Sequence, residues 1–186
     1  NTQGEYSLMP FEILYVKKII PDAYHGTSRT HAKKILIEGF VYVHNEAQYL
    51  GDGVYFFESS MWNAQWWARN FHSNEPCVLH AEIDLGKCFD LNNGAHRKYL
   101  SDLYGRVQME KRLRSKSSGS FDFKITDAAL IELLARECKI DTVRALQTKA
   151  GTGQLFNGSR FLQYQDLVIC VRNTACILKY EIVEGG

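Results

Sequence analysis

Two stretches decide the fold: Ala23-Tyr-His-Gly-Thr27 and Gly51-Asp-Gly-Val-Tyr55-Phe56. The first reads as a strand that runs into a turn, and the second reads as a glycine-rich turn that runs into an aromatic strand. Residues that can cap a following helix are Ser28 and Thr30 after the first stretch, and Ser59 and Ser60 after the second. The sequence therefore predicts two strand–helix units in succession, with Gly39 ending the first helix.

Further along the chain, the pattern predicts more strands than helices. A helix is expected from Thr126 or Asp127 to about Cys138. The expected strands are Cys77–Ile83, Asp141–Leu146, Leu167–Val171 and Cys176–Val183. In the first of these, Leu79, Ala81 and Ile83 share one face, and Val78, His80 and Glu82 share the other. Short strands with few helices between them favour an α+β fold over a doubly wound one.

Three segments are harder to assign. The run Phe11–Val16 fits a strand or a short helix, and Gly151–Arg160 reads as a loop. Residues 94–124 are basic, with a flexible-looking Ser115–Ser120, and are expected to form an insertion. A solvated surface explains this basic segment most simply, and contact with a phosphate backbone is the open alternative.

Composition narrows the class of protein. The chain has 186 residues, of which 45% are hydrophobic, so residues 1–186 are expected to form one domain with a true core. The net charge of +1 is too small for a generic polyanion binder. No apolar stretch approaches the roughly 20 residues of a membrane span, so no membrane partner is expected.

Cysteine usage and the first residues bear on location. Five cysteines, an odd number without a C-x-x-C pair, predict buried thiols rather than a zinc site, and no metal is expected. This usage favours a reducing, cytoplasmic compartment. The first residues lack a signal-peptide pattern and a starting Met, which suits a chain trimmed or excised from a longer protein.

Three blocks together carry the chemistry. They are His25-Gly-Thr-Ser28, the Gly51–Phe56 block with the helix after it, and Tyr164-Gln-Asp166 before an apolar strand. In their order and spacing they resemble the ADP-ribosyltransferases of the diphtheria-toxin-like and poly(ADP-ribose) polymerase-like branch. That branch is marked by a His, a Tyr and usually a Glu on three separate strands. The resemblance covers residues 23–84 and, more loosely, 160–183.

The resemblance implies a split β-sandwich with short flanking helices and a site that takes NAD as co-substrate. It implies that the backbone of Gly26 pairs with the nicotinamide carboxamide and that His25 bonds a ribose hydroxyl. Thr27 and Ser28 would add hydroxyls near the ribose. Tyr55 would stack on the nicotinamide ring, where offset stacking contributes about 0.5–1.5 kcal/mol beyond area burial.

The helix after Tyr55 is expected to supply the other wall of the nicotinamide site. Counting on from Tyr55 along the family pattern places Trp66 over the ring, with Asn63 one turn earlier. The apolar stripe Ala64, Trp67, Ala68 and Phe71 independently directs Trp67 into the core.

At the third position this chain departs from the family, because the usual Glu is missing. The alignment places Asp166 there, with Gln165 one residue earlier. A carboxylate can hold the ribose 2′-hydroxyl and favour a cationic transition state, whereas Gln can only orient the substrate. Either residue remains a candidate, and the departure favours transfer of single ADP-ribose units over polymer formation.

The function expected from these blocks is mono-ADP-ribosylation of a protein side chain or a nucleobase. By analogy with small transferases, the chain would act as a toxin or effector, with an antitoxin or immunity protein as a partner. Two alternatives stay open: a module that binds NAD or ADP-ribose without transfer, and an NAD glycohydrolase. Taken singly, His25, Tyr55, Trp66 and Asp166 each have an ordinary structural explanation. Those explanations do not account for their joint order and spacing.

Overall fold

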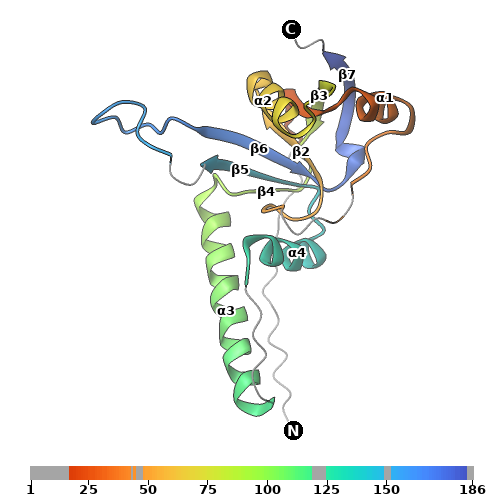
Figure 1. The fold of residues 1–186 in the computed structure, drawn as a ribbon. Coiled ribbons are helices and arrows are strands. Elements are labelled where there is room, and N and C mark those ends of the chain that lie inside the picture. The colour runs from red at the N-terminus through yellow and green to blue at the C-terminus, as the bar shows by residue number, and fades with distance from the viewer. Residues whose placement is uncertain (1–16, 43, 45–47, 119–124, 149–151, 184–186) are drawn as a thin grey trace.

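The fold is built on a mixed seven-stranded sheet. The computed structural model describes residues 17–42, 44, 48–118, 125–148 and 152–183 (Figure 1). The strands are β1 (Ile19–Ser28), β2 (Val54–Glu58), β3 (Pro76–Asp84), β4 (Cys88–Asp90), β5 (Thr142–Thr148), β6 (Gln165–Val171) and β7 (Ile177–Val183). Their order is β4-β5-β6-β2-β1-β3-β7, and only β4 and β5 run parallel among neighbours. This arrangement of strands and helices is compatible with the predicted α+β fold.

Four helices accompany the sheet in the described residues: α1 (Arg29–Glu38), α2 (Met61–Phe71), α3 (Gly94–Ser118) and α4 (Asp127–Cys138). The predicted caps are confirmed for three of them. Ser28, Ser60 and Thr126 accept a backbone N–H from the first turns of α1, α2 and α4. Gly39 ends α1 with a φ of 81°, a conformation that favours glycine. A short 3₁₀ turn, Thr174–Cys176, leads into β7.

Two hydrophobic clusters form the core. One gathers apolar side chains of β1, β2, β3 and α1, including Ala23, Phe56 and Leu79. The other gathers β4, β5, β6, α3 and α4, including Phe89 and Ile131. Neighbouring residues of β6 divide between the clusters, because Ile169 belongs to the first cluster and Val168 and Cys170 belong to the second. Phe56 of β2 belongs to the first cluster. The two clusters therefore lie on opposite faces of the sheet, because successive side chains of a strand alternate.

The predicted alternation of side chains along β3 is confirmed. Leu79, Ala81 and Ile83 are buried as expected. Val78, on the face shared with His80 and Glu82, is also buried, with 2% of its surface exposed. The reason is that α2 covers this side of β3, as the contacts between these two elements show.

Most of the segment that was predicted to be a basic insertion is helical. Residues 94–118 form the long helix α3, which extends away from the sheet (Figure 1). Its first half is anchored by Leu103, which is 2% exposed, with Leu100 and Val107 packed against the same cluster. Residues 119–124 lie outside the described residues, as do Phe11–Val16 and Gly151.

All five cysteines fall in the described residues and are free thiols. Three are buried and two are partly buried, so the prediction that most serve as small core residues is confirmed.

Candidate functional site

The strands that carry the three predicted blocks are neighbours in the order β6-β2-β1. The β1–β2 pair is short: its register contains Ala23↔Glu58 and ends at Tyr24↔Phe57. On its other edge β1 continues to pair with β3 as far as Ser28. The two central strands therefore stop pairing beside His25 and Gly26, where the chemistry was expected.

The backbone of Gly26 faces this opening. On the β2 side, the carbonyl of Asp22 accepts a hydrogen bond from the Ser59 N–H at 2.7 Å. On the β3 side, the N–H of Arg29 donates to the Glu75 carbonyl at 2.8 Å. Polar backbone groups alternate along a strand, so those of Gly26 turn toward β2, beyond the last β1–β2 pair. One N–H donor and one C=O acceptor on a single residue match the two ends of a carboxamide.

The side chain of His25 takes the place of the missing strand pairing. Its Nδ1 lies 2.8 Å from the backbone oxygen of Tyr55. A carbonyl only accepts, so Nδ1 carries the proton and donates. The ring packs against Phe40 and Phe56, with centroids 5.6 Å away in both cases. Burial, reinforced by nearby histidines, lowers the pKa of His25 to about 4, and the ring is therefore neutral near pH 7. Its Nε2 then offers a lone pair to a hydroxyl donor.

This lowered pKa predicts a pH dependence of stability. An unfolded histidine titrates near 6.5, whereas folded His25 titrates near 4. As the pH falls from 6.5 toward 4, the unfolded state binds a proton at this histidine that the folded state does not bind. The free energy of unfolding therefore decreases. Urea unfolding across this window should show a steeper decrease for the wild type than for His25→Gln. Equal pH slopes for the two proteins would contradict the burial of a neutral imidazole.

The ring of Tyr55 is held by its own hydroxyl. That hydroxyl donates to the Gly51 carbonyl at 2.8 Å and accepts from the Leu50 N–H at 3.0 Å. The turn that provides both groups is tied to α4, because the Asp52 N–H donates to Glu132, which also pairs with Arg172 at 2.6 Å. Burial raises the pKa of Tyr55, so the hydroxyl stays protonated. Tyr55 can therefore contact a ligand with its ring, whereas the proton of its hydroxyl is already donated to Gly51.

Of the two candidates at the third position, Asp166 is the one that lies on the same face of the sheet as Tyr55. Asp166 alternates with Val168 and Cys170, which belong to the cluster that Tyr55 and Phe57 border. It is 9% exposed and accepts a hydrogen bond from Nδ2 of Asn63 at 2.5 Å. Gln165 is exposed and points to the other face.

Two polar residues near Asp166 were missed in the sequence. Gln147 of β5 is paired with Asp166 across the sheet, and its Oε1 accepts from the Tyr49 hydroxyl at 2.9 Å. The Tyr49 ring lies 6.0 Å from that of Tyr55. Gln147 is thus a register partner of Asp166 that also holds the Tyr49 ring beside Tyr55. Only the β5–β6 register could have revealed Gln147, whereas the position of Tyr49 just before the glycine turn was a local signal.

The prediction that Trp67 is in the core is wrong, whereas the ligand contact of Trp66 stays a prediction. Trp66 on α2 is 37% exposed. Trp67 was expected in the core but is 42% exposed, with its ring against Phe71 at 4.2 Å and Phe57 at 6.5 Å. Ala64 and Ala68 take the buried face instead. With these small residues on its buried face, α2 lies so close to the sheet that no indole fits beneath it.

Both hydroxyls after Gly26 are committed to α1. Ser28 Oγ accepts the His31 N–H at 3.1 Å, and Thr27 Oγ1 lies 3.3 Å from His31 Nδ1. Thr27 is 2% exposed. Their predicted contact with ribose stays a prediction, and the burial of Thr27 does not favour it.

Other polar groups have structural partners. His80 contacts the Pro21 carbonyl and Asp22, whereas Glu82 pairs with Lys179. Among the residues that the structure describes, no cluster of three or more His, Cys, Asp or Glu side chains is placed to hold a metal ion. Within the same residues, no helix has the length and apolar character that a membrane span requires.

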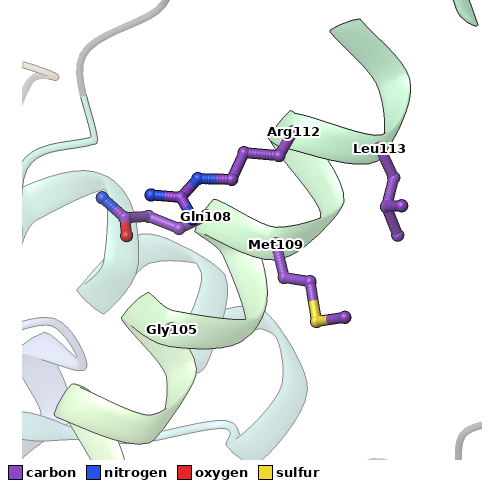
Figure 2. A pocket seen from close by; sticks show the side chains of 5 residues that line it. All are labelled: Gly105, Gln108, Met109, Arg112 and Leu113. Atoms are coloured by element: carbon purple, nitrogen blue, oxygen red, sulfur yellow. The ribbon is translucent and has the colours of Figure 1, made fainter. Parts of the chain in front are cut away.

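A hollow on α3 is separate from these residues. Figure 2 shows its lining, in which Met109 and Leu113 project to one side of the helix and Gln108 and Arg112 to the other. None of the candidate site residues lines it.

No protein-family model matches this chain, and no curated protein matches it either.

Proposed function

We propose that this chain is a mono-ADP-ribosyltransferase that uses NAD as co-substrate. The observation that carries the proposal is the end of β1–β2 pairing beside Gly26, with His25, Tyr55 and Asp166 on adjacent strands around it. These residues are far apart in the sequence but lie on neighbouring strands in the order β6-β2-β1, which supports the proposal. The proposed finer fold is accordingly an ADP-ribosyltransferase-like split β-sandwich, whose split is the opening between β1 and β2.

In this proposal the free backbone edge of Gly26 holds the nicotinamide carboxamide. The ring of Tyr55 provides one wall for the pyridine, and Trp66 provides the other. The neutral His25 accepts a hydrogen bond from a ribose hydroxyl through Nε2, because its Nδ1 proton is donated to the Tyr55 carbonyl. These contacts orient the dinucleotide before any bond breaks.

The reaction breaks the bond between ribose C1′ and the nicotinamide nitrogen. Both electrons of that bond leave with nicotinamide, and positive charge develops on the ribose. The Asp166 carboxylate stabilises this charge and holds the 2′-hydroxyl. A nucleophile of the acceptor then forms the new bond to C1′ and loses its proton to solvent or a nearby base.

The acceptor is proposed to be macromolecular, a protein side chain or a nucleobase. The basic residues of α3 are partly neutralised, for example Lys98 by Asp102 at 2.7 Å. They therefore add little support for a nucleic-acid acceptor. A role as toxin or effector, with an antitoxin or immunity protein as partner, remains part of the proposal by analogy alone.

The test is incubation of the protein with NAD labelled in the adenylate part, with cell extract as the source of acceptors. We expect free nicotinamide together with label on protein or nucleic acid, and loss of both with His25→Ala. Nicotinamide release without labelled acceptor would indicate a glycohydrolase. NAD binding without nicotinamide release would indicate a binding module, and neither binding nor release would overturn the proposal.

A further inference from the structure

The amide of Asn63 and the carboxylate of Asp166 form a contact that the sequence resemblance does not contain. Asn63 lies in the first turn of α2, where its backbone N–H donates to the capping Ser60 at 3.4 Å. Its Nδ2 donates to Asp166 Oδ1 at 2.5 Å, across 103 residues of sequence. The resemblance implies that Asn63 binds the cofactor, but its Nδ2 already donates one hydrogen bond to Asp166.

The carboxylate needs such a partner for two reasons. Asp166 is 9% exposed, and a buried carboxylate is costly unless it accepts hydrogen bonds. Aspartate is also one methylene shorter than the glutamate of the family pattern, so its direction depends more strongly on what holds it. A donor on one oxygen restricts rotation of the whole group and leaves the second oxygen for a substrate hydroxyl.

We propose that Asn63 is a positioning residue that acts through Asp166, orienting its carboxylate toward the ribose 2′-hydroxyl. The inference rests on the proposed function. Asn63 does not touch the reacting atoms, and its effect on the reaction passes through the carboxylate that it holds.

A double-mutant cycle tests this dependence. Nicotinamide release from NAD is measured for wild type, Asn63→Ala, Asp166→Ala and the double variant. Because a misplaced catalytic group costs about 100-fold in rate, Asn63→Ala should lower kcat by about that factor, with a much smaller change in KM. In the Asp166→Ala background the same change should have no further effect. Additive losses would overturn the inference.

Asn63→Asp provides a second test, in which a pH dependence is expected only if Asn63 acts through Asp166 and not if its role is purely structural. The new side chain has the same shape but, when ionised, places one carboxylate against another and donates nothing. Once one of the two carboxyl groups is protonated, a hydrogen bond between them can form again. The activity of Asn63→Asp relative to wild type should therefore rise as the pH falls from about 8 to about 5. A constant ratio across this range would count against the inference.

Asn70→Ala is the matched control, because Asn70 is an exposed asparagine on the same helix, and its amide donates to the Trp66 carbonyl. It should leave kcat unchanged, and circular dichroism should show that all variants fold. A wild type without nicotinamide release overturns the proposed function itself. An active wild type with an unaffected Asn63→Ala variant overturns only the positioning role.

Discussion

Replacing Asp166 by Asn will lower the rate of nicotinamide release from NAD by about two to three orders of magnitude, the usual cost of removing one preorganised electrostatic group. The substitution keeps the size of the side chain and removes its charge. The developing positive charge on ribose then loses the carboxylate that stabilises it more strongly than the ground state. The measurement is the initial rate of nicotinamide release at saturating NAD.

Gln165→Ala is the matched control for Asp166→Asn. Gln165 is the neighbouring polar residue but is exposed on the other face of β6, so its removal should leave the rate within a few-fold of wild type. The reverse result, with Gln165 essential and Asp166 dispensable, would move the third position to Gln165. If neither change affects NAD binding and no release occurs in the wild type, a binding module explains the site.

The parts of the fold that follow from local signals were predictable. Ser28 and Thr126 cap helices, and Gly39 ends one, because capping depends on a few consecutive residues. The order of the strands was not predictable in this way. The sheet places β6 between β5 and β2, and nothing near Gln165 in the sequence specifies that neighbour.

The helix α3 escaped prediction because only part of it has a buried side. Leu100, Leu103 and Val107 lie against the core, but Met109 and Leu113 are exposed, at 63% and 58%. Apolar residues thus occur on two sides of the helix, which weakens the amphipathic period on which a sequence prediction depends.

The same contrast between local signals and long-range contacts applies to the candidate site. The residue types and their order could be predicted, as His25, Tyr55 and Asp166 do lie on three adjacent strands. The hydrogen bonds among the residues that surround them could not be predicted. Tyr49 and Gln147 are 98 residues apart, and their contact depends on the register of β5 with β6.

The exposure of Trp67 has a physical cause in β1. The backbone of α2 comes so close to the sheet at Gly26 that only Ala64 and Ala68, both fully buried, fit beneath the helix. Small residues therefore make this contact, and the larger aromatic Trp67 is displaced to the side. A hydrophobic stripe indicates which face is apolar, but not how near the helix approaches.

This close approach predicts the effect of Gly26→Ala. A Cβ at position 26 would overlap the carbonyl oxygen of Ala64 and lie 3.1 Å from the backbone nitrogen of Ala68. Both are backbone atoms, so no side-chain rotation relieves the overlap and α2 must shift. Overpacking of this kind costs about 3 kcal/mol at the upper end of its usual range. For a chain of this size that corresponds to a decrease in Tm of roughly 6–12 °C, measurable by calorimetry.

Gly105→Ala is the control for this substitution. Gly105 is a helical glycine of α3 with nothing within 4 Å of its added Cβ, so alanine there should stabilise the protein by up to about 1 kcal/mol. Nicotinamide release should be retained in Gly105→Ala. It should be lost in Gly26→Ala even at temperatures where that variant is folded, because the shift of α2 separates Asn63 from Asp166. A Gly26→Ala variant with wild-type Tm and activity would show that α2 does not lie against β1 as described.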